Sequence, residues 1–382
     1  MKKSFKFIDL FSGIGGFHQA MTNLGGKCVF ASEIDPHCIE VYKKNYGIDS
    51  WHDITQVDAK DIPQHDVLCG GFPCQSFSKA GKQLGINEAR GTLFFDIARI
   101  LEYHHTKYIV LENVRNLVSH DNGNTWKTIQ EILHNLGYRL TKKPLILSPH
   151  QFGVPQLRER VYILGKYEPE NVDTPLEVKL PKLKTKGENS IYSILEEDVG
   201  SNLSEYENKV LTMWDDFYQG IKETVIGYPV WADYFTKKSD SSMPDWKKEF
   251  IKKNHNLYVN NKDFIDSWLK KYSNLKGIIP THHKFEWQAG ANINSVFEGL
   301  IQFRPSGVRV KVPDVFPALV AIVQTPIIGK YRRRISLREC ARLQSFPDSF
   351  ILDSDLHAAY KQFGNSVNVK VLSAISSALF LE

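Results

Sequence analysis

The chain has 382 residues, 42% of them hydrophobic and 24% charged, which is the balance of a soluble globular protein with a core and with length enough for two domains. Its net charge of +5 permits a polyanionic partner without requiring one. Its five cysteines are odd in number and lack a Cys-x-x-Cys pair, and no apolar segment near the start suits a signal peptide or a membrane span, so the sequence argues against a disulfide framework or zinc site and favours a reducing cytosol.

The first predicted unit is a strand, a turn, a helix and a second strand. Residues 5–11 predict the first strand, residues 13–16 (Gly-Ile-Gly-Gly) predict a tight turn into a helix over 17–24, and a second predicted strand over 28–32 ends at Glu33. This order is typical of the opening of a Rossmann-type nucleotide fold. The Gly-x-Gly-Gly spacing favours an adenosine without pyrophosphate, and Glu33 can accept both ribose hydroxyls. A turn without a ligand is the alternative for this motif alone.

A cysteine follows the third predicted strand. Residues 67–69 predict a buried strand, and the Gly-Gly-Phe-Pro run over 70–73 must turn the chain there. That turn would carry Cys74 past the carboxyl edge of the sheet, where open α/β folds bind ligands. Most cysteines are small buried hydrophobes, and Cys69 fits that description. The polar, Pro-kinked setting of Cys74 instead predicts a nucleophile.

A carboxylate follows the next strand. Residues 91–101 have the apolar spacing of an amphipathic helix, and residues 108–111 predict a buried strand that ends at Glu112. The carboxyl end of a central strand lies over the same crevice as Cys74, so we favour a site role for Glu112. A solvated strand end is the alternative.

Two arginines share one face of a later strand. Strand alternation places Gln156, Arg158 and Arg160 on one side and Glu159 on the other. Two guanidinium groups beside the crevice suit a phosphate or a polarised carbonyl oxygen. A surface strand would also tolerate them, so both interpretations stay open for this motif alone.

The middle of the chain has a different character. Residues 166–190 are rich in Lys, Glu and Pro and predict a linker, and residues 200–290 hold five of the seven tryptophans without a Rossmann pattern, which predicts a separate module. Tryptophans beside lysines can stack on bases, but we favour a core role. The basic segments 303–311 and 332–334 suit a nucleic-acid backbone or a solvated face. An apolar helical pattern over 368–381 predicts a return to the first domain.

These motifs, in this order, resemble the DNA (cytosine-5)-methyltransferase family of the bacterial restriction–modification type. The matching residues are Asp9-Leu10-Phe11-Ser12-Gly13-Ile14-Gly15-Gly16-Phe17, Glu33-Ile34-Asp35, Gly71-Phe72-Pro73-Cys74-Gln75-Ser76-Phe77-Ser78, Glu112-Asn113-Val114, Gln156-x-Arg158-x-Arg160, Arg338-Glu339-Cys340-Ala341-Arg342-Leu343-Gln344-Ser345-Phe346-Pro347 and Gly364-Asn365-Ser366-Val367. The sequence departs from the family pattern at His52 and Ser345, where the family commonly has Gly. Neither departure touches the proposed chemistry.

The resemblance implies a covalent mechanism. Cys74 would add to carbon 6 of a cytosine flipped out of the duplex, which makes carbon 5 nucleophilic enough to accept a methyl group. Glu112 would protonate or hydrogen-bond nitrogen 3. Arg158 would contact the carbonyl oxygen and align the ring, and Arg160 would support the site.

The resemblance also implies the methyl donor, S-adenosyl-L-methionine, which leaves as S-adenosyl-L-homocysteine. The implied cofactor contacts are Phe11, Gly13, Ile14, Gly15, Gly16, Glu33, Ile34, Asp53, Ile54, Pro73, Asn365 and Ser366. The implied DNA contacts are Gln75, Ser78, Arg304, Ser306, Arg309, Lys311 and Arg333, and no metal is implied.

The implied fold is α/β, with a Rossmann-like S-adenosylmethionine-dependent methyltransferase domain and a smaller target-recognition domain across a DNA-binding cleft. The expected catalytic domain is residues 1–189 completed by 355–382, and the expected recognition domain is residues 190–354. We expect a cytoplasmic bacterial enzyme, nucleoid-associated through double-stranded DNA, monomeric, and paired with a restriction endonuclease for the same site.

Three alternatives stay open at this point. The substrate of the same chemistry could be transfer RNA, although the long Trp-rich block argues for DNA. A nicotinamide-dependent oxidoreductase on a Rossmann fold would leave Cys74, Glu112 and the two arginines unexplained. An inactive DNA-binding regulator would not need the complete set of catalytic residues.

Overall fold

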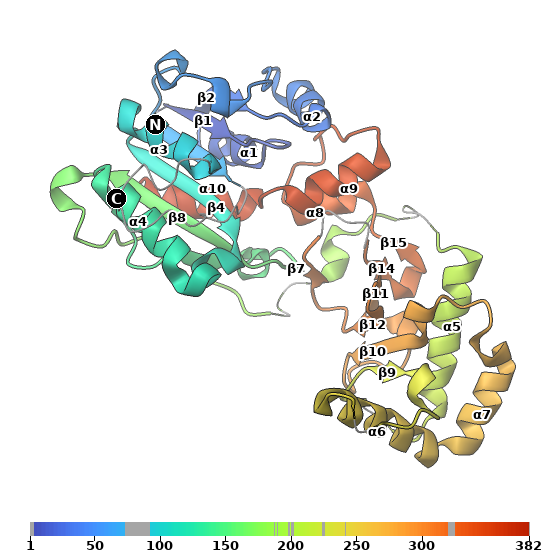
Figure 1. The fold of residues 1–382 in the computed structure, drawn as a ribbon. Coiled ribbons are helices and arrows are strands. Elements are labelled where there is room, and N and C mark those ends of the chain that lie inside the picture. Colours follow the sequence, from blue (N-terminus) through green and yellow to red (C-terminus); the bar gives the residue numbers. More distant parts are fainter. Residues whose placement is uncertain are drawn as a thin grey trace. The chain divides into compact units, whose positions relative to one another are not determined.

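The computed structural model describes residues 4–381 except 73–91, 187, 189, 198, 200–201, 224–225, 241 and 320–324. The chain forms two compact units, each with its own sheet and core (Figure 1). The first unit comprises Met1–Ser190, Pro317–Val323 and Leu337–Glu382, and the second comprises Ile191–Phe316 and Gln324–Ser336. Among the described residues, none of the helices combines the length and the apolar character needed to cross a membrane.

A seven-stranded sheet with the order β2-β1-β3-β4-β8-β5 forms the centre of the first unit, and β6 also pairs with β8. Its strands are β1 (Phe5–Leu10), β2 (Gly26–Ser32), β3 (Val67–Gly71), β4 (Tyr108–Val114), β5 (Tyr138–Leu140), β6 (Leu145–Leu147) and β8 (Arg160–Tyr167). Strands β1 to β4 are parallel, whereas β8 is antiparallel to β4. Because β2 and β3 flank β1 on opposite sides, the carboxyl end of β1 is a topological switch point, where such sheets bind ligands.

Helices cover both faces of this sheet, which confirms the predicted Rossmann-like α/β fold. The helices are α1 (Gly16–Asn23), α2 (Pro36–Tyr46), α3 (Leu93–His104), α4 (Asn124–Asn135), α8 (Leu337–Leu343), α9 (Leu356–Asn365) and α10 (Val369–Leu379). α3 and α4 pack on the face that carries Ile8 and Leu68. On the other face His18 of α1 contacts Phe7, and α1 packs against α10. The last helix therefore does return to the first unit.

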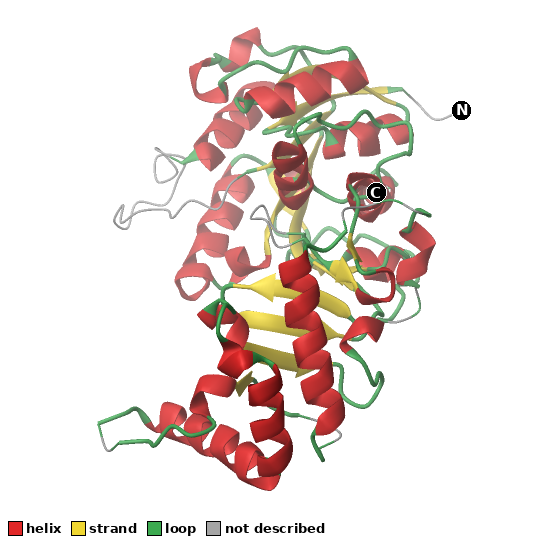
Figure 2. Cartoon of the chain, turned by 90° about the vertical axis from the view of Figure 1, so that its right-hand side faces the viewer, coloured by secondary structure: helices red, strands yellow, loops and turns green. Residues whose placement is uncertain are grey.

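The second unit has a six-stranded sheet with the order β15-β14-β11-β12-β10-β9. Its strands are β9 (Val230–Trp231), β10 (Lys284–Gln288), β11 (Leu300–Arg304), β12 (Gly307–Lys311), β14 (Ile327–Ile328) and β15 (Arg333–Arg334), its helices are α5 (Glu205–Gly220), α6 (Asp245–Asn260) and α7 (Lys262–Lys271), and two further short strands of the chain are β7 (Gln156–Leu157) and β13 (Phe316–Pro317). α5 lies along one face of the sheet, where Trp214 stacks on Phe285 of β10 with ring centroids 4.8 Å apart (Figure 2).

The expected core role of the tryptophans holds for most of them. Trp214, Trp268 and Trp287 are buried in the core of the second unit, and Trp231 is half-buried. Trp246, near the start of α6, is 70% exposed and is the exception. Indole rings therefore build this core.

The second unit ends earlier than the predicted boundary at residue 354. α8 belongs to the first unit, where Cys340 and Leu343 are fully buried. The Val369 N–H donates to the Gln344 carbonyl at 3.0 Å, which joins the end of α8 to the start of α10. These contacts and the division of the chain place residues 337–354 with the first unit, which corrects the predicted boundary.

Candidate active site

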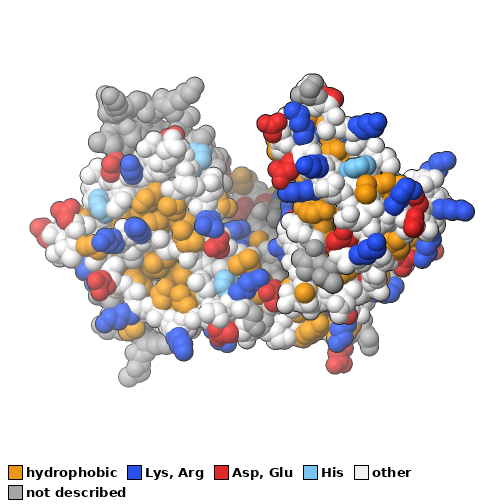
Figure 3. Space-filling view, turned by 90° about the horizontal axis from the view of Figure 1, so that it is seen from below, with side chains coloured by type: hydrophobic (Ala, Val, Ile, Leu, Met, Phe, Trp, Pro, Cys, Tyr) orange, Lys and Arg blue, Asp and Glu red, His pale blue; other side chains and the backbone are white. Residues whose placement is uncertain are grey.

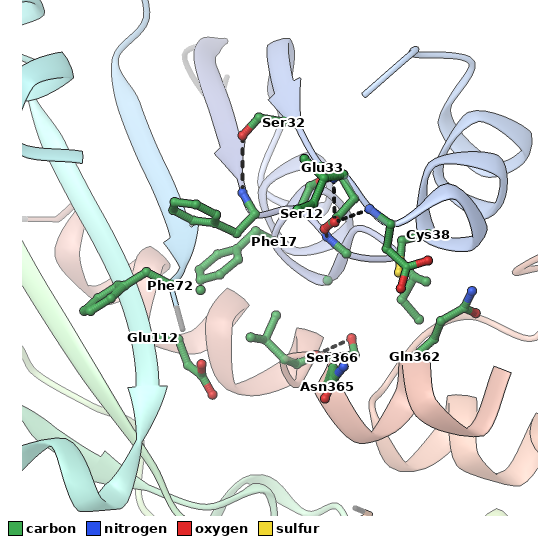
Figure 4. A pocket seen from close by; sticks show the side chains of 18 of the residues that line it. Ser12, Phe17, Ser32, Glu33, Cys38, Phe72, Glu112, Gln362, Asn365 and Ser366 are labelled. Atoms are coloured by element: carbon green, nitrogen blue, oxygen red, sulfur yellow. Dashed lines mark hydrogen bonds between the residues drawn. The ribbon is translucent and has the colours of Figure 1, made fainter. Parts of the chain in front are cut away.

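A cavity of about 490 Å³ opens at the carboxyl ends of the parallel strands in the first unit. Its volume is that of a small-molecule site. The predicted site residues that line it are Phe11, Gly13, Ile14, Gly16, Glu33, Ile34, Asp53, Ile54, Glu112, Arg158, Arg160, Asn365 and Ser366. Figure 4 shows Glu112 and Glu33 on different sides of the cavity, with Asn365 and Ser366 below Glu33 in this view.

The turn between β1 and α1 uses left-handed backbone conformations. φ is +54° at Phe11, +52° at Gly13 and +88° at Gly15. A β-carbon on Gly13 would meet no atom within 4 Å, because this residue borders the open cavity. Glycine thus lets a ligand approach the backbone here. Phe11 is a bulky residue in a strained conformation, and such strain gathers at binding sites.

Gly15, a predicted cofactor contact, does not line the cavity. The Tyr46 hydroxyl donates to the Gly15 carbonyl at 3.0 Å. A β-carbon on Gly15 would lie 2.2 Å from the Tyr46 ring. Gly15 therefore lets the start of α1 pack closely against α2.

We expect Gly15→Ala to destabilise the protein more than Gly25→Ala. Both glycines have left-handed φ values, +88° and +93°, but a β-carbon on Gly25 would meet nothing within 4 Å. Gly25→Ala adds backbone strain alone, about 1–2 kcal/mol. Gly15→Ala adds the clash with Tyr46 as well, about 1–3 kcal/mol more. Thermal unfolding followed by circular dichroism measures both, and equal losses would contradict the packing argument.

The Glu33 carboxylate organises the turn as well as the cavity. Its Oε2 accepts the Gly13 N–H at 2.8 Å, and its Oε1 accepts the Ile34 and Asp35 N–H groups at 2.7 and 2.9 Å. An ionised carboxylate offers about four lone-pair directions. One direction on Oε2 therefore remains open to a further donor, such as a ribose hydroxyl.

An apolar wall lies beside Glu33. Ile34 is 65% exposed at the cavity, and Ile54 is buried in its lining. Arg99 of α3 donates to the Ile54 carbonyl and pairs with Asp96 at 3.0 Å. These bonds hold the Asp53–Ile54 segment in place, so the wall is preformed.

Glu112 lies at the opposite side of the cavity and is 8% exposed. Its Oε1 is 3.1 Å from Arg160 Nε, yet the N–H of that atom is not directed at it, and this buried oxygen has no hydrogen-bond donor among the described residues. Burial raises the pKa of Glu112, and the charges of Arg160 and Arg158 counteract only part of that rise. The carboxyl therefore keeps its proton to higher pH than an exposed Glu.

Arg158 is 3% exposed and is engaged with the backbone. Its guanidinium donates to the carbonyls of Leu319, Gly364 and Ser366 at 3.1, 2.8 and 2.8 Å. Burial, reinforced by the charge of Arg160, lowers the pKa of Arg158 to about 10. This geometry favours Arg160 over Arg158 for contact with a substrate ring. The predicted alternation is present, since Gln156 and Arg158 are buried and Arg160 is half-buried, whereas Glu159 is exposed.

Four predicted residues, Pro73, Cys74, Gln75 and Ser78, lie outside the described residues. The described chain leads to them through Gly71 and Phe72, which line the cavity. The Asn113 side chain donates to the Phe72 carbonyl at 2.9 Å and fixes this exit from β3.

The predicted DNA contacts of the second unit have different settings. Arg304 and Arg309 lie 3.7 and 2.7 Å from Glu286, Ser306 is exposed between β11 and β12, and Lys311, half-buried, ends β12. Arg333 is only 6% exposed and donates to the Glu196 carbonyl at 2.9 Å. Its burial argues against the predicted DNA contact, because its guanidinium holds the unit together.

The sequence left several lining residues unassigned. They are Ser12, Phe17, Ser32, Asp35, Cys38, His52, Gly71, Phe72, Leu93, Asn113, Val114, Gln362, Gly364 and Val367. Ser12 stands inside the glycine turn motif, and its buried hydroxyl has no partner among the described residues, so position alone could have marked it. Cys38 and Gln362 lie on α2 and α9 without a local signal.

Comparison with known proteins agrees with this geometry. Residues 5–381 match the profile of the family described as C-5 cytosine-specific DNA methylase. The type II methyltransferase M.AluI of Cellulosimicrobium cellulans is 33% identical over 478 residues, covering 97% of this chain and 91% of the relative. M.HpaII of Haemophilus parainfluenzae is 35% identical over 383 residues, covering 98% and 88%.

A solved structure supports the fold. A DNMT2 mutant of Spodoptera frugiperda matches with a TM-score of 0.54 and 21% identity, covering 98% of this chain and 99% of that one. At this identity the match bears on the fold alone. The family match over nearly the whole chain and the two relatives bear on the chemistry. The chain therefore belongs to the C-5 cytosine-specific DNA methylase family and is a DNA (cytosine-5)-methyltransferase that uses S-adenosylmethionine.

Proposed function

We propose that the cavity of the first unit binds S-adenosylmethionine at the glycine turn and receives the target cytosine at the Glu112 side. The residues fit the cofactor, since Gly13 leaves an open cradle, Ile34 and Ile54 offer apolar walls and Glu33 keeps one acceptor direction. When bound, the cofactor supplies an electrophilic methyl group. Phe11, Ile14, Gly16, Asp53, Asn365 and Ser366 complete the described lining assigned to it.

The observation that carries this proposal is the buried Oε1 of Glu112, which lacks a hydrogen-bond donor among the described residues. A neutral carboxyl there can donate to nitrogen 3 of a flipped cytosine. As the Cys74 thiolate bonds to carbon 6, the electron pair of the carbon 5–carbon 6 double bond becomes available at carbon 5, which takes the methyl group. Transfer of the carbon-5 proton to water then re-forms the carbon 5–carbon 6 double bond and expels the Cys74 thiolate, and the proton on nitrogen 3 returns to Glu112.

Within this mechanism we assign ring contact to Arg160 and a positioning role to Arg158. Arg160 lines the cavity beside Glu112 and is only partly buried. The Arg158 guanidinium is committed to three carbonyls, two of them in the 364–366 segment that lines the cavity. Arg158 thus holds the wall against which the substrates lie.

We expect opposite effects from replacing the two arginines. Arg160→Met should lower kcat by about 10²-fold, the cost of one preorganised donor, with an unfolding temperature near that of the parent. Arg158→Met should lower stability by at least about 2 kcal/mol, because three buried carbonyls lose a charged donor. Tritium-methyl transfer and thermal unfolding measure the pair. A folded Arg158→Met enzyme with a large loss in kcat, beside an unaffected Arg160→Met enzyme, would reverse the assignment.

We propose that the second unit reads the DNA sequence. It has a sheet and core of its own, and its β11–β12 hairpin exposes Ser306 at the turn. The relatives are named type II methyltransferases. From these names we infer that the enzyme works in the bacterial cytoplasm and protects host DNA from an endonuclease with the same recognition sequence, and we propose that it is a monomer.

Bisulfite sequencing of plasmid DNA tests the function directly. Cells that express the protein should yield protected cytosines in one short sequence context, and cells that express Cys74→Ala should yield none. Complete conversion in both samples, with soluble folded protein, would reject DNA as the substrate. An RNA methylation assay would then follow.

A further inference from the structure

The tight turn between β14 and β15 of the second unit is rigidly held. It consists of a short 3-10 turn, η13 (Gly329–Tyr331), followed by Arg332 at φ +49°. The Gly329 N–H donates to the Gly299 carbonyl at 3.0 Å, and a β-carbon on Gly329 would lie 2.8 Å from the Phe297 carbonyl oxygen. The Arg332 N–H closes the turn on the Gly329 carbonyl at 3.0 Å. The 329–332 turn is therefore held against the backbone of Phe297 and Gly299.

Three successive arginines stand at the end of this turn, and their side chains have different partners. Arg333 donates to the Glu196 carbonyl, and Arg334 pairs with Glu207, so both serve the fold. Arg332 is exposed, its guanidinium lies 3.9 Å from the centroid of the Phe297 ring, and no carboxylate pairs with it among the described residues. Stacking on an aromatic face orients the planar group and leaves its N–H edge available.

A lysine two residues earlier has a similar setting. The Lys330 ammonium lies 5.2 Å from the centroid of the Tyr192 ring and 5.5 Å from that of the Tyr331 ring. Both tyrosines are partly exposed, at 43% and 48%. Lys330 has no carboxylate partner among the described residues either. Some other lysines of the unit, such as Lys271 beside Asp216, are ion-paired instead.

On the face seen in Figure 3, Lys and Arg side chains are interleaved with Asp and Glu rather than gathered in one field. Arg332 and Lys330 differ from the other cations beside aromatic rings, such as Lys284 over Trp231, because both lie on one hydrogen-bonded turn. An anion bound there meets side chains that have already lost much of their freedom.

We propose that Arg332 and Lys330 form a clamp for the phosphate backbone of the DNA that the enzyme methylates. The inference rests on the proposed DNA-reading role of the second unit and names the side chains that anchor the duplex to it. Phosphate contacts position a protein on DNA without reading its sequence. Each cation that neutralises a phosphate releases counterions, so the clamp has a signature in the salt dependence of binding.

Fluorescence anisotropy over a salt series tests the clamp with the full-length enzyme. The probes are a duplex with the site found by bisulfite sequencing and a duplex without it. Arg332→Gln should weaken binding to both by the same factor and reduce the slope of log K against log salt by about 1. The double variant with Lys330→Gln should reduce it by about 2. Lys276→Gln, which removes an exposed charge elsewhere in the same unit, should leave the slope unchanged.

The outcomes separate this inference from the function on which it rests. Unchanged slopes for Arg332→Gln and the double variant, in a parent enzyme that methylates DNA, would overturn the clamp alone. A loss confined to the duplex with the site, accompanied by relaxed methylation specificity, would also overturn it and assign Arg332 to a base edge. A parent that methylates no DNA would instead reject the proposed function. Thermal unfolding of Arg332→Gln should stay close to that of the parent, since the stacking of this exposed side chain on the Phe297 ring is a weak contact.

Discussion

Cys74→Ala is expected to abolish methyl transfer while DNA binding persists. Without the thiolate, carbon 5 of cytosine is too weak a nucleophile to accept the methyl group, so the loss should exceed about 10⁴-fold. Cys74 follows Phe72 by two residues, and Phe72 lines the cavity that also holds Glu112. Single-turnover methylation measures the rate, and anisotropy measures DNA binding. Denaturing electrophoresis with DNA that contains 5-fluorocytosine should trap a covalent adduct with the parent enzyme only.

Cys38→Ala is the matched control. Cys38 also lines the cavity, but burial raises the pKa of its thiol, and the nearby carboxylates of Glu33 and Asp35 raise it further. A protonated thiol is a poor nucleophile, so this variant should keep its turnover within a few-fold. Trapping by Cys74→Ala, or its loss in Cys38→Ala, would assign the nucleophile to Cys38.

The sequence was sufficient to predict which side chains lie at the carboxyl edge of the sheet. Parallel strands end on the same side, so Glu33 after β2 and Glu112 near the end of β4 could be placed around one crevice although they are distant in sequence. Period-2 alternation likewise placed Arg158 and Gln156 on one face opposite Glu159, and in the structure that face is the buried one. These inferences need only local pattern and one topological rule.

The sequence could not distinguish the roles of side chains whose partners come from distant segments. Arg158 donates hydrogen bonds to the carbonyls of Leu319, Gly364 and Ser366, and no local sequence pattern predicts these long-range bonds. The role of Arg333 was hidden for the same reason, because the Glu196 carbonyl that accepts its hydrogen bond is far away in the sequence. The role of Gly15 also depends on a distant residue, since the Tyr46 ring rather than a ligand fills the space beside this glycine.

The pH behaviour of Glu112 follows from its burial. Its pKa in the folded protein is raised, so the folded state holds this proton at pH values where the unfolded chain has lost it. The stability contribution of this group therefore falls as pH rises from the ordinary pKa of Glu through the raised folded pKa. The acid form that donates to nitrogen 3 declines over the same range.

Glu112→Gln is expected to separate activity from stability. The amide keeps the shape and can donate an N–H, but it cannot deliver a proton, so kcat should fall by about 10²–10⁴-fold. The KM for S-adenosylmethionine should change little, because Glu33 and Glu112 stand on opposite sides of the cavity. Gln has no charged form to desolvate, so the unfolding temperature at neutral pH should be no lower than that of the parent.

The pH profile of kcat distinguishes an acid from a merely structural group. The parent should lose rate on the alkaline side as Glu112 deprotonates, whereas the slow Gln variant should lack that descending limb. Arg160→Met should move the same limb to higher pH, because the Arg160 charge lowers the pKa of Glu112. An unchanged rate in Glu112→Gln would remove the acid role. A large loss in rate with an unaltered profile would leave Glu112 only the task of orienting the ring.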